Sequence, residues 1–239
     1  MTAPLRVDVI TLFPEMFAGP FDASILQRAR DAGLLAIHVH CLRDYATGRH
    51  AVVDDYPYGG GPGMLLKPEP VCRAVEAVRG PDARVVVMAA NGRRFEQAQA
   101  AAWARSPQLV VVCGHYEGLD ERIVETLQAE TVSIGDYVLT GGEIGAMVVV
   151  DAVARLVPGV LGDQVSAEDE SYAAGLLEYP QYTRPPVFRG RAVPEVLLRG
   201  DHAAIAAWRR RAALERTLAL RPDLLDDRAW TECERLGLL

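Results

Sequence analysis

The chain lacks several features that define common classes of protein. Lys67 is the only lysine among its 239 residues, and none of its four cysteines forms a Cys-x-x-Cys pair. The absence of such a pair excludes the usual zinc and redox motifs, and buried free thiols are expected instead. No apolar run is long enough to cross a bilayer, and residues 1–6 carry no signal-peptide pattern. We therefore expect a cytoplasmic protein with no membrane partner.

Two signatures of nucleotide-binding folds are absent as well. The chain has no Gly-x-Gly-x-x-Gly between a strand and a helix, and no Gly-x-x-x-x-Gly-Lys-Ser/Thr phosphate loop. A nicotinamide oxidoreductase is therefore disfavoured. The composition that is present, 50% apolar and 24% charged, is typical of a soluble globular protein with one large or two smaller domains.

Charge is unevenly distributed along the chain. The formal net charge is −7, yet residues 184–221 hold nine arginines and three acidic residues, a local net charge of +6. A basic segment on an acidic protein is typical of a surface that contacts phosphate. The alternative is that these arginines are ordinary solvent-exposed residues on helix surfaces that bind no phosphate, since this chain uses arginine in place of lysine almost everywhere.

Strand and helix patterns alternate over residues 1–160. Strands are predicted over 5–12, 34–42, 84–88, 109–113 and 132–134, and helices over 22–30, 68–79, 94–105, 119–127 and 143–157. Asp22 is predicted to cap the first helix and Gly33 to end it. The alternation predicts an α/β fold with a parallel sheet covered on both faces.

Glycine-bearing loops follow three of these strands, at residues 89–92, 114–118 and 135–142. The carboxyl ends of parallel strands meet at one edge of a sheet, where ligands bind. Because glycine lets a backbone or a ligand approach closely, these glycines together with Tyr137 predict a main-chain pocket for a flat aromatic ligand. A fourth loop, 43–66, breaks every periodic pattern, and a loop of that length indicates a function.

The composition changes after the α/β region. Residues 160–174 are polar and acidic, which predicts a linker. Prolines punctuate the extended segment that follows, and Asp201 is then predicted to cap a helix with Trp208 and Leu214 on its apolar side. With a short final helix over 223–236, this region predicts a small helical second domain.

Six stretches combine into a specific pattern that covers nearly the whole chain. They are Asp-Asp-Tyr-Pro-Tyr-Gly-Gly-Gly-Pro-Gly-Met at 54–64, Gly-His-Tyr-Glu-Gly-Leu-Asp-Glu-Arg at 114–122, Ser-Ile-Gly-Asp-Tyr-Val-Leu-Thr-Gly-Gly-Glu at 133–143, Asp-Ala-Val-Ala-Arg-Leu-Val-Pro-Gly-Val-Leu-Gly at 151–162, Leu-Leu-Glu-Tyr-Pro-Gln-Tyr-Thr-Arg-Pro at 176–185 and Val-Pro-Glu-Val-Leu-Leu-Arg-Gly-Asp-His at 193–202. In this order, the stretches resemble the bacterial tRNA (guanine-N1)-methyltransferases of TrmD type, in the SPOUT trefoil-knot class.

The resemblance implies a fold, a reaction and partners. The fold is an α/β domain over residues 1–160 with a parallel sheet and a deep C-terminal trefoil knot, a flexible acidic linker over 161–174, and a small all-helical tRNA-binding domain over 175–239. The reaction is methyl transfer from S-adenosyl-L-methionine to N1 of the guanosine immediately 3′ of the tRNA anticodon, position 37. The partners are the tRNA anticodon arm and a second copy of the chain, with the active site between the two subunits.

The resemblance also assigns residues to the donor and to the RNA. The donor-binding residues are Met88, Ala89, Ala90, Gly114, Tyr116, Glu117, Ile134, Gly135, Asp136, Tyr137, Val138, Leu139, Gly141 and Gly142. The tRNA-binding residues are Tyr58, Gly59, Arg184, His202, Arg209 and Arg210. Magnesium dependence is associated with the family, but the chemistry requires no metal ion and no residue is assigned to one.

Guanine N1 carries a proton at neutral pH, so methylation needs a general base and a cation near the guanine O6. By resemblance, a linker carboxylate is the base and Arg155 is the cation. The linker departs from the family order: side-chain type favours Asp169, register favours Glu170, and both remain candidates. His115 and Gly145 also replace residues common in the family. The alternative to an enzyme is a non-catalytic nucleotide- or RNA-binding regulator on the same fold.

Overall fold

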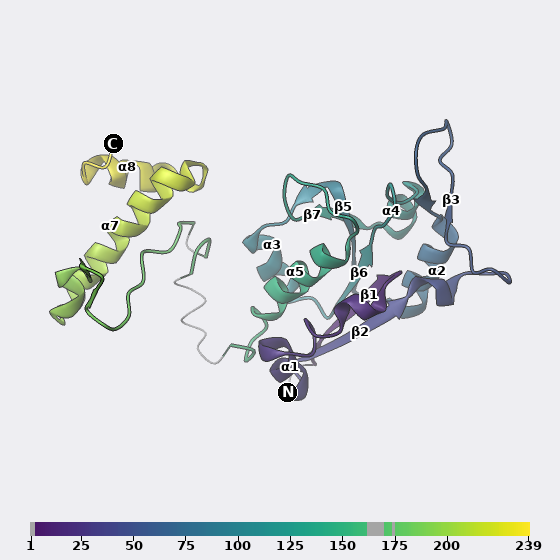
Figure 1. The fold of residues 1–239 in the computed structure, drawn as a ribbon, viewed down its shortest axis with the longest axis horizontal. Helices are drawn as coiled ribbons and strands as arrows, with labels where there is room; N and C mark the ends of the chain where they lie inside the picture. The colour runs from purple at the N-terminus through teal and green to yellow at the C-terminus, as the bar shows by residue number, and fades with distance from the viewer. Residues whose placement is uncertain (1–2, 162–169, 174) are drawn as a thin grey trace. The chain divides into compact units, whose positions relative to one another are not determined.

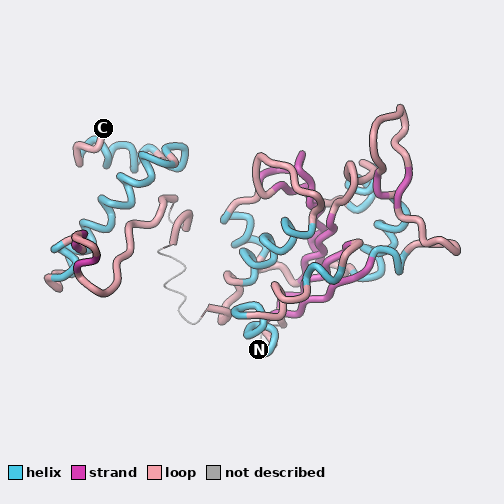
Figure 2. The backbone as a smooth tube through the Cα atoms, viewed as in Figure 1, coloured by secondary structure: helices cyan, strands magenta, loops and turns pink. Residues whose placement is uncertain are grey.

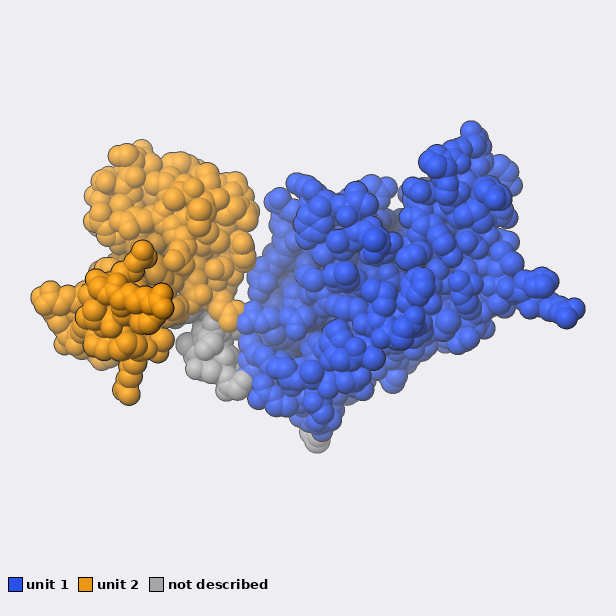
Figure 3. All heavy atoms as spheres, in the orientation of Figure 1, with its two compact units in different colours: residues 1–162 blue, residues 163–239 orange. Residues whose placement is uncertain are grey.

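The computed structural model describes residues 3–161, 170–173 and 175–239. The chain separates into two compact units, Met1–Gly162 and Asp163–Leu239, which Figure 3 draws in different colours. Each unit has its own cluster of buried apolar side chains.

A five-stranded parallel sheet forms the centre of the first unit, with the strand order β2-β1-β6-β5-β7. Its strands are β1 (Leu5–Thr11), β2 (Leu35–Cys41), β5 (Ala83–Arg94), β6 (Gln108–Cys113) and β7 (Glu130–Ser133). Every strand predicted from an apolar run is present. The central strand β6 is buried along its whole length, which explains why its sequence is almost continuously apolar.

Helices cover both faces of this sheet. α1 (Ser24–Asp31), α3 (Gln97–Trp103) and α5 (Glu143–Ala154) pack into one apolar cluster, and α2 (Pro68–Val78) and α4 (Arg122–Leu127) into another. Figure 1 shows α3 and α5 on one side of the strands and α2 and α4 on the other. The predicted α/β fold with a doubly covered parallel sheet is confirmed. Across the described residues, no helix combines the length and apolar character of a membrane span.

The predicted start of the first helix is wrong. α1 begins at Ser24 with Ala23 at its N-cap position, and no side chain caps it. Asp22 forms an ion pair with Arg30 instead, so its carboxylate is directed to the end of the helix rather than to its first N–H groups. The predicted stop is confirmed, because Gly33 has a left-handed φ of 68° and its N–H donates to the carbonyl of Arg30.

β5 is longer than its apolar run predicted. It continues past Met88 to Arg94, because after a register shift it pairs with β7 a second time. Gly92 permits this approach, since a Cβ there would lie 2.4 Å from the backbone nitrogen of Val132. The continuation of β5 beyond Met88 therefore depends on the lack of a side chain at Gly92, which a pattern of apolar residues does not reveal.

The long loop between β2 and α2 is tied to the body of the first unit. It begins with the short helix η2 (Leu42–Tyr45), and the antiparallel strands β3 (Asp54–Asp55) and β4 (Leu65–Leu66) pair across its base. Backbone hydrogen bonds of 2.9–3.1 Å then join residues 64–66 to residues 117–120, in the loop after β6. The loop is therefore continuous with the edge of the sheet where β6 ends.

The second unit is built around α7 (His202–Leu220), which packs with α8 (Asp227–Arg235). The Asp201 carboxylate accepts hydrogen bonds of 3.1 Å from two backbone N–H groups of the first turn, so the predicted cap is confirmed. Leu214 and Cys233 are fully buried in the small core between the helices. Short 3-10 helices complete the described elements: η1 (Pro14–Phe17) in the first unit, and η3 (Glu195–Leu198) and η4 (Pro222–Leu224) in the second.

The second unit is not all-helical, which corrects the sequence prediction. Two short strands, β8 (Val187–Phe188) and β9 (Arg191–Ala192), pair as an antiparallel hairpin, drawn as strand in Figure 2. The two residues between them, Arg189 and Gly190, both have positive φ, 51° and 77°. Such a two-residue turn matches the twist of paired strands and closes a tight hairpin.

Candidate active site

A cavity of about 590 Å³ opens at the carboxyl ends of β5, β6 and β7. That size is typical of small-molecule sites. The three glycine-bearing loops predicted to converge do converge on it. The lining consists of residues 87–91, 114–119, 131–134 and 137–142 together with Glu121, Val124 and Gly145.

One wall of the cavity is main chain packed on main chain. The N–H of Gly142 donates a 2.7 Å hydrogen bond to the carbonyl of Gly114. A Cβ on Gly142 would lie 2.7 Å from the Gly114 nitrogen and 2.9 Å from the Met88 Cβ, closer than real side chains approach. A residue with a side chain would push these loops apart, so both glycines are required by geometry.

The loop after β7 folds back on itself. The Ser133 hydroxyl donates to the Gly135 carbonyl at 2.9 Å, and the ring of Tyr137 lies where a Cβ on Gly135 would be. Every predicted donor-binding residue lines the cavity except Gly135 and Asp136. Those two shape the turn and do not face the space.

A buried carboxylate lies behind this wall. Glu143, the first residue of α5, is 2% exposed and accepts a 2.8 Å hydrogen bond from the hydroxyl of Thr11. A negative charge at a helix N-terminus is stabilised by the helix dipole. Burial raises the pKa of the Cys113 thiol well above its ordinary value, and the charge of Glu143 raises it further. The Cys113 thiol behind the cavity therefore stays protonated near neutral pH.

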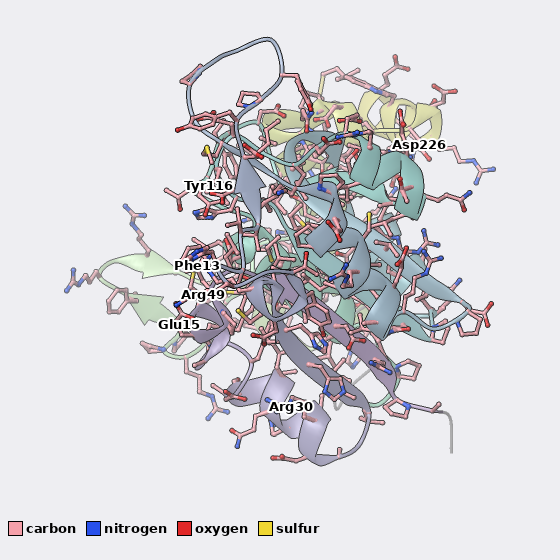
Figure 4. The ribbon with its side chains drawn as sticks, turned by 90° about the vertical axis from the view of Figure 1, so that its right-hand side faces the viewer. Phe13, Glu15, Arg30, Arg49, Tyr116 and Asp226 are labelled. Carbon is pink, nitrogen blue, oxygen red and sulfur yellow. The ribbon has the colours of Figure 1, made fainter. Side chains whose placement is uncertain are left out.

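His115 joins this buried region to the cavity surface. Its ring lies 4.8 Å from that of Phe13 and 5.0 Å from that of Tyr116, both labelled on the same side of the view in Figure 4. Its Nδ1 is buried and has no hydrogen-bond partner among the described residues. A buried polar atom without a partner is costly, so His115 is a candidate to contact a ligand. The sequence marked it only as a departure from the family.

Tyr116 connects the cavity to the long loop. Its backbone has a left-handed φ of 60°, which is strained for an aromatic residue. Burial raises the pKa of its phenol, and a hydrogen bond with Asp54 raises it further, while Arg43 opposes the change. These contacts come from residues 43–66, so that loop helps to hold Tyr116 at the cavity rim.

Of the candidate catalytic residues, Arg155 belongs to the first unit and is not in the cavity lining. Arg155 is the C-cap residue of α5. Glu170 is partly buried in the second unit, and Asp169 lies outside the described residues. The structure thus brings most of the predicted donor-site residues together in the first unit.

The predicted RNA-binding residues lie at the surface of their units. Tyr58 is 99% exposed, beside Gly59 at the tip of the long loop. Arg184 and His202 are also exposed. In the second unit the guanidinium of Arg209 lies 4.7 Å from the centre of the Tyr179 ring, and Arg210 forms a 2.7 Å ion pair with Glu232. That pair partly offsets the charge of Arg210.

Metal-ligating residues do not gather in the part of the chain that the structure describes: it holds no group of three or more His, Cys, Asp or Glu side chains placed to bind an ion. The imidazole of His40 instead contacts the carboxylate of Asp8, with 2.9 Å between Nε2 and Oδ1.

Some lining residues were missed by the sequence. Glu121 and Val124 come from the start of α4 and the turn before it, where only a helical pattern was visible. No local signal marks these positions, because only the tertiary packing places them at the cavity.

The fold and the site define a class of protein: an α/β protein with a ligand cavity of main-chain loops at the carboxyl edge of a parallel sheet. Residues 5–227 match the family model described as tRNA (Guanine-1)-methyltransferase TrmD. The chain is similar to proteins named tRNA (guanine-N(1)-)-methyltransferase from Dehalococcoides mccartyi, with 53% identity over 97% of this chain and 94% of the relative. Others are from Geobacillus kaustophilus, 51% over 98% and 97%, and Desulforudis audaxviator, 57% over 92% and 89%. The chain therefore belongs to the tRNA (guanine-1)-methyltransferase TrmD family.

Proposed function

We propose that this protein transfers a methyl group from S-adenosyl-L-methionine to N1 of the guanosine immediately 3′ of the anticodon in tRNA. The names of the family and of its relatives support a tRNA substrate and the guanine N1 position. The observation that carries the proposal is the main-chain cavity at the meeting point of β5, β6 and β7, in a chain that matches this family over nearly its whole length.

The cavity fits the methyl donor. S-adenosyl-L-methionine supplies an electrophilic methyl group when it is bound. Main-chain N–H and C=O groups of residues 134 and 137–142 would pair with the polar edge of its adenine, while Ile134 and Leu139 would pack on the ring. A site of backbone groups and apolar side chains recognises a neutral aromatic ring by shape and hydrogen bonding, not by charge.

The side chains supply the acid–base chemistry at guanine. Asp169 or Glu170 accepts the N1 proton as the attack proceeds, a role that contributes about 10²- to 10⁴-fold in rate. Arg155 faces the negative charge that develops on O6 and stabilises it electrostatically. No step in this scheme requires a metal ion, and adding magnesium to a chelated assay tests that directly.

The finer features of the fold are part of the proposal. We propose a trefoil knot in the C-terminal part of the first unit, although knots are rare among proteins. The match to the family supports it, and the close packing of Gly142 on Gly114 is compatible with chain segments that pass near one another. We also propose that residues 175–239 form a tRNA-binding domain, joined to the first unit by a linker over residues 161–174, most of which lie outside the described residues.

A homodimer is the proposed assembly. α5 is apolar around most of its circumference, and Ile144 and Val148, four residues apart on one face, are 47% and 45% exposed. Tyr137 and Val138, at 56% and 84%, add exposed apolar surface in the loop before it. A second copy of the chain would cover this surface and bring its own linker to the site.

The deciding experiment measures transfer of labelled methyl groups to tRNA transcripts that carry guanosine or adenosine 3′ of the anticodon. Labelling only of the guanosine transcript, at N1, is expected. Equal labelling of both would refute the proposal. Tight donor binding by calorimetry with no turnover on any tRNA would favour the non-catalytic regulator instead.

A further inference from the structure

The hairpin of the second unit presents an aromatic ring to solvent. Phe188 is 61% exposed, and every residue from 181 to 192 is exposed. Phe188 lies opposite Arg191 in the antiparallel pair, so these two side chains share a face. The guanidinium of Arg189 lies 5.3 Å from the centre of the Phe188 ring. The tip is therefore a ring flanked by two cationic groups.

The two arginines of the tip differ from the ion-paired arginines of the second unit. Arg211 forms an ion pair with Glu215, whereas no described carboxylate lies within ion-pair distance of Arg189 or Arg191. The segment 179–194 contains no acidic residue at all. The positive charge of the tip is therefore uncompensated and points to a polyanionic partner.

The tip is held in one shape by its turn and its base. Arg189 and Gly190 are both left-handed, and the N–H of Val193 donates a 2.9 Å hydrogen bond to the carbonyl of Pro186 across the base of the hairpin. A preformed loop loses little conformational entropy when it binds.

We propose that the tip of this hairpin is an RNA-contacting element, in which Phe188 stacks on an unpaired base while Arg189 and Arg191 contact the flanking phosphates. Stacking of bases on aromatic side chains and backbone contacts from arginine are how proteins hold unpaired RNA. The inference rests on the proposed function, which makes tRNA the ligand, and it adds residues outside the surface of Arg184 and Arg209. A protein partner for the same tip is the competing outcome.

The test measures binding of the full-length protein to unmodified tRNA, by fluorescence anisotropy over a range of salt concentrations. Phe188→Ala is expected to weaken binding on the order of tenfold, the size of effect seen when one base–aromatic stack is lost. Phe188→Trp should retain binding, and Phe188→Leu, which keeps the apolar area without the ring, should behave as Phe188→Ala. Circular dichroism melts confirm that each variant is folded.

The arginines are tested by salt dependence. Arg189→Gln and Arg191→Gln are each expected to lower the slope of log K against log salt by about 0.7–0.9, as for one lost phosphate contact. Arg211→Gln is the matched control, because it removes the same charge from an arginine that is paired. Its slope should be unchanged.

Three results would overturn the inference. Binding unchanged in Phe188→Ala and Arg191→Gln would do so, as would equal binding by Phe188→Leu and wild type. The third is altered self-association by light scattering with intact RNA binding, which would assign the tip to a protein. Methyl transfer is measured separately with the wild type, so failure of the inference and failure of the proposed function give different patterns.

Discussion

The hydroxyl of Thr11 donates a 2.8 Å hydrogen bond to the carboxylate of Glu143, across 132 residues of sequence. Both side chains are buried, and Thr11 also accepts a hydrogen bond from the backbone of Phe13. The contact fixes the end of β1 to the first residue of α5, directly behind the cavity. This hydrogen bond therefore joins β1 to α5.

Thr11→Val should destabilise the first unit by about 1.5–3 kcal/mol, the range for losing a hydrogen bond to a charged group. Valine has nearly the same shape, so the loss reports the hydroxyl and not the packing. Urea unfolding followed by the fluorescence of buried Trp103 measures it. Thr183→Val, at an exposed position, is the control and should change stability by less than about 0.5 kcal/mol. Equal effects would contradict this account.

Gly142→Ala should abolish donor binding and destabilise the fold by about 1–3 kcal/mol, because its Cβ would meet the backbone of Gly114. Gly145→Ala is the matched comparison three residues along. There the Cβ would lie 3.0 Å from the terminal methyl of Met88, the far end of a flexible side chain, and at ordinary contact distance from Ile134, and alanine favours the helix, so stability should be kept and binding should be weakened far less than in Gly142→Ala. Calorimetry with the donor and thermal melts distinguish the two. Similar behaviour of both variants would argue against a main-chain wall.

The general base is identified by comparing Asp169→Asn and Glu170→Gln in single-turnover methyl transfer. The variant that removes the base should slow the chemical step by about 10²- to 10⁴-fold, and the other should remain near the wild-type rate.

Arg155→Gln should lower the rate of methyl transfer on the order of 10²-fold or more, since the negative charge on O6 loses its cation. Mixing the Arg155 variant with the slower acid variant should restore activity if the site lies between subunits. Wild-type rates in both acid variants would remove the linker from the mechanism.

Acid should destabilise the first unit through Asp8. Burial alone would raise the pKa of this carboxyl, but hydrogen bonds from Arg6, Gln108 and His40 outweigh it and hold the pKa below its ordinary value of 3.8. The folded pKa is below the unfolded one, so this stabilisation is present above the unfolded pKa and is lost as the pH falls through the folded pKa. Chemical unfolding between pH 7 and pH 2.5 should show that loss, with a shallower pH dependence in Asp8→Asn. The exposed Asp31→Asn should leave the profile unchanged.

Cys113 should be inert to alkylation in the native protein. Its thiol is fully buried and its pKa is raised, so little thiolate forms near neutral pH. Mass spectrometry should find it modified only after denaturation, whereas the partly exposed Cys41 reacts in the native state. Native labelling of Cys113 would indicate that the cavity wall opens.

The sheet and its covering helices were predictable because each leaves a periodic trace. The run at 108–113 is apolar at nearly every position since both faces of β6 are covered. The end of β5 left no such trace, because Gly92 and the polar residues beside it pair with β7 through backbone alone. The start of α1 was mispredicted because the carboxylate of Asp22 could either cap the first N–H groups of the helix or pair with Arg30. In the structure it pairs with Arg30.

The position of the cavity was predictable from the sequence, but some of the residues that line it were not. Glycine-bearing loops after three strands indicate where a ligand binds, so residues 114–118 and 137–142 could be assigned. Glu121 and Val124 contribute through tertiary position, which no local pattern encodes. The hairpin at 187–192 was missed because its turn places an arginine, not asparagine or aspartate, in a left-handed conformation.

The glycine wall has a consequence for inhibition. A compound that hydrogen-bonds only to backbone groups of residues 114–118 and 137–142 engages atoms that every amino acid shares. Substituting Gly114 or Gly142 to exclude such a compound would push the packed backbones apart and disrupt the cavity wall itself. Resistance would then have to arise at side chains on the rim, such as Tyr116 or Leu139, or through increased expression.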